Sequence, residues 1–247
     1  MPLFDNTDLE THPIKGSSFG FSATRIDKLG ASEYTLVGIA VDASSSVGSF
    51  AKELNACLQE VVKACRQSPR ADNLMLRLVS FDSNVNEIHG FRPLTECNVD
   101  DYASAVHPNG STALYDATLS LTQSLVQYGK DLTASDFDVN AILFVITDGE
   151  DNRSTFTKKA VAEAFKNAVQ SESLESVVTI LIGVNVTDPG VGRYLKSFHA
   201  DAGFTQYEEL DNANAKTLAR LAAFVSKSIS AQSQALGSKG ASQALSF

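Results

Sequence analysis

Three short stretches of the sequence carry oxygen-bearing side chains at spacings that suit a hard cation. They hold Asp42, Ser44 and Ser46, then Thr112, then Asp148. Carboxylate and hydroxyl oxygens, without histidine or thiolate, are the ligands that Mg²⁺ and Mn²⁺ prefer. Asp42, Ser44 or Thr112 alone would be read as a helix cap. Together they predict a site for Mg²⁺, with Mn²⁺ as the alternative ion.

Other polar residues close to these stretches are assigned simpler roles. Asp116, Glu150 and Asp151 are expected to be capping, surface or supporting groups, because acidic side chains are usually exposed. His89 and His107 stand apart from other potential ligands and are expected to be solvated or hydrogen-bonded structural residues. The predicted metal set therefore stays at five residues.

Two apolar runs place the aspartates. Leu36 to Asp42 and Val139 to Asp148 each read as a buried central strand that ends in an aspartate. The carboxyl ends of parallel strands meet at one edge of a sheet, where ligands bind in open α/β folds. Both aspartates are therefore expected at the same edge.

The rest of the chain alternates between strand and helix patterns. The expected helices are 49–67, 113–128, 157–171, 192–202 and 215–230, with a short helix near 101–106, and the further strands are 73–81, 85–91, 177–184 and 206–210. The brief connection at 82–84 implies a hairpin and hence an antiparallel edge strand. The alternation predicts an α/β, doubly wound, mostly parallel sheet with helices on both faces.

The two ends differ from this pattern. Residues 1–33 are expected to be an N-terminal extension, either packed through Phe19 and Phe21 or poorly ordered. Residues 34–231 form the predicted domain. The Ser-, Gly- and Ala-rich stretch 232–247 is expected to be a C-terminal tail with little core-forming content.

Composition excludes several functions. The chain has 247 residues, 43% of them hydrophobic, and a formal net charge of −9. This charge argues against nucleic-acid binding, which depends on Lys and Arg neutralising phosphates. No apolar run approaches the roughly 20 residues of a membrane span, and the first ten residues do not resemble a secretory signal. Three cysteines without a CxxC pair favour neither a disulfide framework nor a zinc site, so a cytoplasmic location is expected.

At the level of motifs, the chain resembles the von Willebrand factor A (vWA) domain family over roughly residues 33 to 230. That family's metal-ion-dependent adhesion site (MIDAS) combines an Asp-x-Ser-x-Ser loop, a threonine loop and a Thr-Asp-Gly loop, and all three motifs are present here in order. The stretch 111–117 looks like stand-alone bacterial and phage members. The resemblance implies a six-stranded sheet of order 3-2-1-4-5-6 with strand 3 antiparallel, and a metal held between strands 1 and 4.

The resemblance also implies a function. In such sites the hydroxyls bind the metal directly and aspartates act partly through water, so the ion stays open to a partner's Asp or Glu. The expected role is a metal-dependent protein–protein interaction module, an adaptor or scaffold without enzymatic turnover. Relatives often work beside AAA+ ATPases of the MoxR type or in stress-response complexes, which makes these the implied partners.

Two other functions compete with this one. One is a Mg²⁺-dependent phosphoryl-transfer enzyme. A phosphatase of the haloacid-dehalogenase type would need a second acid two residues after Asp42, where Ser44 stands, and the chain has no P-loop and no Gly-x-Ser-x-Gly elbow. A self-assembling structural protein, in which one copy's acidic group reaches the next copy's metal, would form homo-oligomers through head-to-tail contacts.

Overall fold

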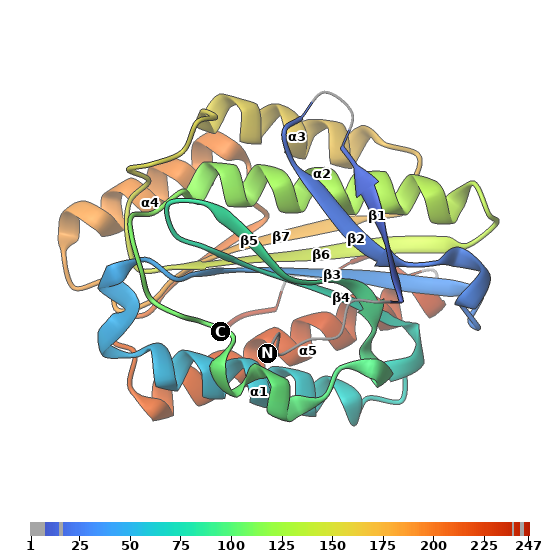
Figure 1. Cartoon of the computed structure of the whole chain (residues 1–247), viewed down its shortest axis with the longest axis horizontal. Helices are drawn as coiled ribbons and strands as arrows, with labels where there is room; N and C mark the ends of the chain where they lie inside the picture. Colours follow the sequence, from blue (N-terminus) through green and yellow to red (C-terminus); the bar gives the residue numbers. More distant parts are fainter. Residues whose placement is uncertain (1–7, 15–16, 239, 243–244) are drawn as a thin grey trace.

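The protein was analysed as a computed structural model that describes residues 8–14, 17–238, 240–242 and 245–247. Its strands form one mixed sheet, and helices cover both faces of that sheet (Figure 1). The α/β class expected from the alternation of strands and helices is therefore confirmed.

The sheet has eight strands in the order β1-β2-β5-β4-β3-β6-β7-β8. The strands are β1 Leu9–Pro13, β2 Gly20–Thr24, β3 Glu33–Asp42, β4 Leu74–Phe81, β5 Val85–Pro93, β6 Asp138–Thr147, β7 Val177–Gly183 and β8 Gln206–Glu209. From β4 to β8 all neighbours are parallel, whereas β5 is antiparallel to β4 and β1 is antiparallel to β2.

The predicted number of strands, six, is wrong, because the sheet has eight. The six expected strands lie next to one another in the expected sequence, with β5 antiparallel, but β1 and β2 from the expected extension continue the sheet past them. As a result β5 is not an edge strand, because β2 pairs with it through Ala23 and Phe91. The edges are β1 and β8.

Strand β2 joins the sheet through a close approach that only glycine permits. A Cβ atom at Gly90 would lie 2.0 Å from the backbone oxygen of Ser22. The aromatic Phe21 is 2% exposed and contacts the rings of Phe91 and Tyr128. The residue pattern of this segment is too short and too mixed to signal a strand, so its place in the sheet depends on these contacts with distant residues.

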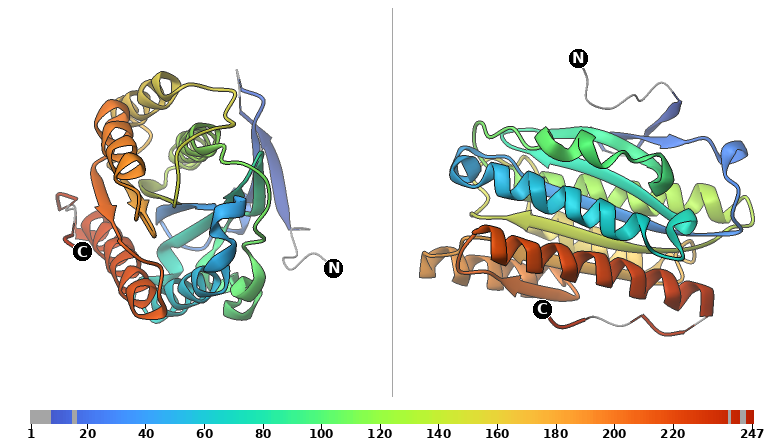
Figure 2. Two further views of the ribbon diagram at one scale, coloured as in Figure 1. Left: turned by 90° about the vertical axis from the view of Figure 1, so that its left-hand side faces the viewer. Right: turned by 90° about the horizontal axis from the view of Figure 1, so that it is seen from below.

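The helices form two layers that enclose the sheet (Figures 1 and 2). They are α1 Ala51–Arg66, α2 Leu114–Thr133, α3 Lys158–Gln170, α4 Pro189–Ala202 and α5 Ala215–Ser238. Helices α1 and α5 pack on one face, and α2, α3 and α4 pack on the other. Each layer encloses its own apolar core, so the sheet is buried on both sides, as its nearly uncharged strands require.

Helix α5 continues beyond its expected end at residue 230. Its last turns bury Gln232, whose backbone oxygen accepts a hydrogen bond from Asn140 and whose amide donates to the backbone oxygen of Ala141. Leu236 is buried as well. These contacts with the sheet hold the helix as far as Ser238, and composition does not reveal them.

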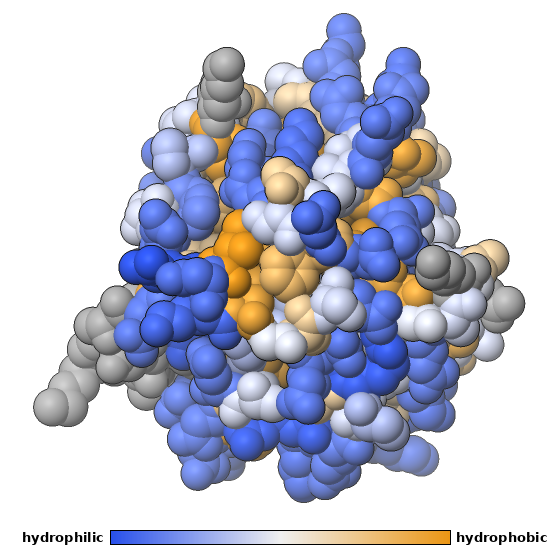
Figure 3. Space-filling model, turned by 90° about the vertical axis from the view of Figure 1, so that its right-hand side faces the viewer, coloured by the Kyte–Doolittle hydropathy of each residue, from blue (hydrophilic) through white to orange (hydrophobic). Residues whose placement is uncertain are grey.

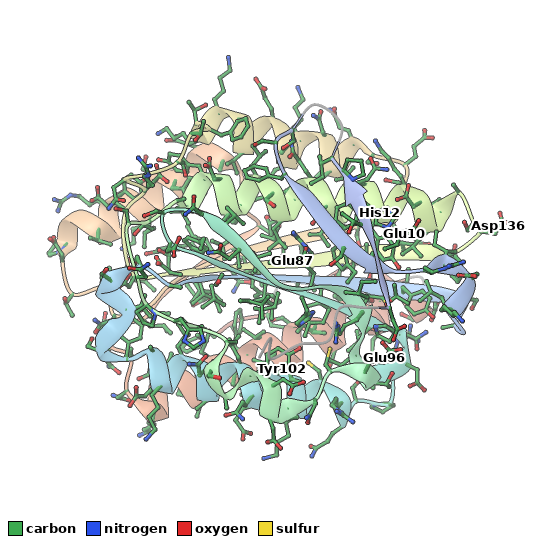
Figure 4. All side chains as sticks on the ribbon, in the orientation of Figure 1. Glu10, His12, Glu87, Glu96, Tyr102 and Asp136 are labelled. Carbon is green, nitrogen blue, oxygen red and sulfur yellow. The ribbon has the colours of Figure 1, made fainter. Side chains whose placement is uncertain are left out.

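A buried ion pair lies between the sheet and α2. Arg77, 1% exposed, donates to the Glu87 carboxylate at 2.8 Å and to the Ser124 hydroxyl at 3.0 Å. Glu87 also accepts hydrogen bonds from the backbone and the hydroxyl of Ser22. Figure 4 shows Glu87 beside β2, so one carboxylate joins β2, β4 and β5.

The surface at the amino-terminal ends of the parallel strands is largely hydrophilic, with a smaller apolar area near its centre (Figure 3). Asp136, in the turn between α2 and β6, marks this end in Figure 4. Among the described residues, no helix is both long enough and apolar enough to cross a membrane.

Candidate metal centre

The opposite end of the sheet brings the predicted ligand loops together. Strands β3 and β6 run side by side in parallel, with Val41 paired to Ile146. Their carboxyl ends therefore place Asp42 next to Thr147 and lead directly into the loops that follow. Figure 2, left, looks onto this end of the molecule.

Asp42 is the most buried charged group of the set, at 1% exposure. One carboxylate oxygen accepts the backbone N–H of Ser44 at 2.8 Å, and the other accepts the hydroxyl of Thr147 at 2.6 Å. Burial raises the pKa of Asp42 to about 6, although these hydrogen bonds lower it. The structure thus holds a carboxylate in a place where an unbalanced negative charge is costly.

A chain of hydrogen bonds joins three further ligand candidates. The Ser44 and Ser46 hydroxyls lie 3.0 Å apart, and the Ser46 hydroxyl donates to the Asp148 carboxylate at 2.8 Å. Burial raises the pKa of Asp148, while the Ser46 hydroxyl lowers it. The first and third loops, over 100 positions apart in sequence, therefore present a contiguous set of oxygens.

Thr112 lies on the adjoining loop at 4% exposure. Its hydrogen bonds run through its backbone, which contacts Asn152 on the third loop. Its hydroxyl is not hydrogen-bonded to the other four predicted ligands in the part of the chain that the structure describes. The structure thus brings four of the five residues into one hydrogen-bonded group and places Thr112 on the next loop.

The simpler explanation, helix capping, does not account for these hydroxyls. Ser44 precedes the short 3-10 helix Ser45–Ser49 and makes no side-chain cap to it. Helix α1 begins after Phe50 and α2 after Ala113, and neither start has a side-chain cap from its own N-cap residue. Helix capping therefore does not explain why hydroxyl side chains stand at these positions.

Backbone contacts interlock the first two loops. The N–H of Asn109 donates to the oxygen of Ala43 at 2.7 Å, and the N–H of Ser45 donates to the oxygen of Gly110 at 3.2 Å. Gly110 has a φ of +67°, and a Cβ there would lie 2.6 Å from the Ser83 hydroxyl. The left-handed backbone at this turn therefore favours glycine.

The donor set fits a small hard cation. In an octahedral Mg²⁺ site with bonds of roughly 2.0–2.1 Å, neighbouring ligand oxygens lie about 2.8–3.0 Å apart. The separations from Ser44 to Ser46 and from Ser46 to Asp148 fall in this range, which is also that of hydrogen bonds. Within the described residues no three His, Cys, Asp or Glu side chains cluster for metal binding, so a cation here would depend on the hydroxyls.

The neighbouring acids have the supporting roles expected of them. Asp116 accepts the backbone N–H groups of Thr155 and Phe156, and Asp151 accepts that of Tyr115 and the hydroxyl of Ser154. Their carboxylates are therefore occupied by the protein itself.

Asn152 was missed by the sequence reasoning. It is the residue that contacts the Thr112 backbone, and its position four residues after Asp148 was the available signal.

Of His89 and His107, the first is fully buried, and its ring is hydrogen-bonded to the oxygen of Gly90 and the hydroxyl of Tyr102, as a structural residue would be. His107 is exposed. Figure 4 shows Tyr102 on the side of the sheet that α1 covers. The three cysteines are free and buried. These are Cys57, Cys65 and Cys97.

A comparison with models of protein families finds no match to this sequence, and a comparison with curated protein sequences finds none either. Solved structures do share the fold. A mutant of the PilB minor pilin from Streptococcus sanguinis aligns with a TM-score of 0.60 at 14% identity, over 88% of this chain and 66% of that one. The pilus adhesin SpaC from Lactobacillus rhamnosus GG aligns with a TM-score of 0.58 at 13% identity, over 92% and 35%.

Proximal thread matrix protein 1 from the mussel byssus aligns with a TM-score of 0.50 at 15% identity, over 79% of this chain and 45% of that one. The chain thus spans just under two thirds of the PilB chain and less than half of the other two. At these identities the likeness establishes a shared α/β architecture and nothing about ligands.

Proposed function

We propose that this chain is a metal-dependent protein-binding domain of the vWA type. Its ligand set for Mg²⁺, or for Mn²⁺, consists of Asp42, Ser44, Ser46, Thr112 and Asp148. The observation that carries the proposal is the contiguous group of hydroxyl and carboxylate oxygens contributed by the first and third loops.

The charge balance of the set favours an acidic partner. Two of the five side chains are carboxylates, and one of them, Asp42, already accepts hydrogen bonds from Ser44 and Thr147. A Mg²⁺ ion bound by mostly neutral oxygens would offer a Lewis-acidic position to an outside carboxylate. An Asp or Glu side chain of a protein partner is therefore the proposed ligand. By resemblance, a MoxR-type AAA+ ATPase or a stress-response complex is the class of partner to test first.

Calorimetric titration of the protein with Mg²⁺ and Mn²⁺ tests the metal assignment. We expect binding by the wild type and at least a tenfold loss in Asp42→Ala and Thr112→Ala, because each removes a proposed ligand. The matched control is Ser49→Ala, an exposed serine in the same loop. Equal affinities for the wild type, Asp42→Ala and Thr112→Ala would show that the metal is not held there.

An affinity capture experiment tests the protein-binding role. The wild-type chain is used as bait in Mg²⁺ and in EDTA, beside Asp42→Ala in Mg²⁺. We expect a partner that is retained only by the wild type in Mg²⁺. A partner that is captured equally in all three samples would mean that binding does not pass through the metal.

A further inference from the structure

Helix α2, which begins directly after the Thr112 loop, lacks a cap of its own. Its first N–H groups have no partners within the helix, and Ala113 offers no side-chain acceptor. The loop after β6 supplies the acceptors instead. The N–H of Tyr115 donates to the Asp151 carboxylate at 3.4 Å, and the N–H of Asp116 donates to the Ser154 hydroxyl at 3.0 Å.

Asn152 holds Thr112 from the same loop. Its side-chain oxygen accepts the N–H of Thr112 at 2.9 Å, and its own N–H donates to the Thr112 oxygen at 3.1 Å. Both backbone polar groups of Thr112 are thus paired with one residue. Since a threonine side chain rotates only about χ1, fixing this backbone limits its hydroxyl to the few positions that the staggered rotamers allow.

The loop that carries Asn152 is itself held on two further sides. Asp116 in α2 accepts the N–H groups of Thr155 and Phe156, and the N–H of Asp151 donates to the hydroxyl of Tyr194 in α4. In Figures 1 and 2 this loop between β6 and α3 passes beside the start of α2. Its placement is therefore set by two helices as well as by the end of β6.

We infer that Asn152 is a positioning residue for the proposed metal centre. It couples the Thr112 loop to the Asp148 loop, so that the second and third ligand loops keep a fixed relation whether or not metal is bound. The inference rests on the proposed function for its effect on metal affinity, but the coupling itself is a property of the metal-free chain.

Hydrogen exchange in EDTA tests the coupling without metal. In Asn152→Ala we expect the Thr112 amide to exchange about tenfold faster, the factor expected from the loss of one hydrogen bond. Asn152→Asp keeps an acceptor oxygen at the same place and should restore the protection. Unchanged exchange in Asn152→Ala would overturn the inference.

Mg²⁺ titration of the same variants tests the effect on the site. We expect Asn152→Ala to bind Mg²⁺ about 10-fold to 100-fold more weakly, as is usual when a residue that orients a metal ligand is removed. Arg153→Ala, an exposed neighbour, makes the loop one charge more negative, as Asn152→Asp does, and so controls for charge.

The two proposals fail in different ways. Wild-type affinity in Asn152→Ala, with Asp42→Ala still impaired, would overturn the positioning role alone. Absence of Mg²⁺ binding by the wild type would overturn the proposed function, and the exchange data would then decide separately whether Asn152 fixes the Thr112 loop.

Discussion

The buried carboxylate of Asp42 lowers the stability of the fold when it is ionised. The carboxylate is 1% exposed, and burial raises its pKa to about 6 from an ordinary value near 3.8. An acid whose pKa is higher in the folded state than in the unfolded chain destabilises the fold at any pH above the unfolded value. Residues that lower stability in this way are common at binding sites.

The variant Asp42→Asn should therefore be more stable than the wild type in EDTA. At pH 7 the shift of about two pKa units corresponds to a gain of up to about 3 kcal/mol in the free energy of unfolding. Mg²⁺ should stabilise the wild type but not the variant. Urea denaturation in EDTA and in Mg²⁺ measures both effects.

Asp211→Asn, at an exposed position, is the matched control for the change in charge. If Asp42→Asn were no more stable than the wild type in EDTA, the burial of the Asp42 carboxylate would not lower the stability of the fold.

The buried ring of His89 should make the stability of the fold depend on pH in the acidic range. Burial lowers its pKa from 6.5 to about 3, helped by the nearby charge of Arg92. Its Nδ1 lies 2.9 Å from the Gly90 oxygen, which can only accept, so Nδ1 must donate and Nε2 must accept from Tyr102. The neutral ring therefore satisfies both bonds.

The stability contributed by neutral His89 should be complete above pH 6.5 and lost as the pH falls from 6.5 towards 3, because the unfolded chain takes up the proton first. The slope is about 1.4 kcal/mol per pH unit. The free energy of unfolding, measured in urea from pH 4 to 7, should fall less steeply in His89→Gln than in the wild type. Parallel curves would contradict this assignment.

At the level of elements, the ion pair between Arg77 and Glu87 links β2 to the central strands. Arg77 is 1% exposed, while its partner Glu87 also accepts from the backbone of β2 at Ser22. Removing one partner of a buried pair leaves an uncompensated charge, which costs about 3–5 kcal/mol. The pair is therefore a structural junction between β2 and the central strands.

Glu87→Gln should lower the free energy of unfolding by about 3 kcal/mol and expose the β1–β2 amides to hydrogen exchange. The control is Glu163→Gln, which breaks an exposed pair with Lys159 and should cost less than about 0.5 kcal/mol. A similar small effect in both variants would mean that β2 is held by apolar contacts such as those of Phe21 alone.

At the scale of the whole molecule, large apolar side chains are scarce on the described surface. Among the described residues, Val169 is the only large hydrophobic side chain that is exposed, at 72%. Stable interfaces between identical subunits usually bury well over 1,000 Å² of surface that is largely apolar. For the proposed module we therefore expect a single chain in solution.

Light scattering should give a mass near the 26.4 kDa of one chain in both Mg²⁺ and EDTA. A larger mass in Mg²⁺ that disappears in EDTA and in Asp42→Ala would instead favour the self-assembling alternative, in which one copy supplies the carboxylate for the next. The same larger mass in both buffers would indicate an interface unrelated to the metal.

The sequence by itself determined the central strands, the helices and the five ligand candidates. Strands such as Leu36–Asp42 are buried on both faces, and helices show the 3.6-residue repeat, so each pattern is visible within about ten consecutive residues. The motif residues were visible because their types are unusual at the end of an apolar strand. The full length of α5 could not be predicted in this way, because Gln232 is held by hydrogen bonds with Asn140 and Ala141, which are far away in sequence.

Only the tertiary structure decided the two extra strands, the contact of Ser46 with Asp148, and the pairing of Asn152 with Thr112. Each depends on residues that are far apart in sequence. The backbone of Ser22 can approach β5 because Gly90 has no side chain. Asn152 is hydrogen-bonded to Thr112, which lies 40 positions earlier in the chain. A side chain that bonds a distant backbone leaves no periodic pattern, because its partner is fixed by the packing of whole elements. The ligand types are thus a local property of the sequence, and their arrangement is a property of the folded sheet.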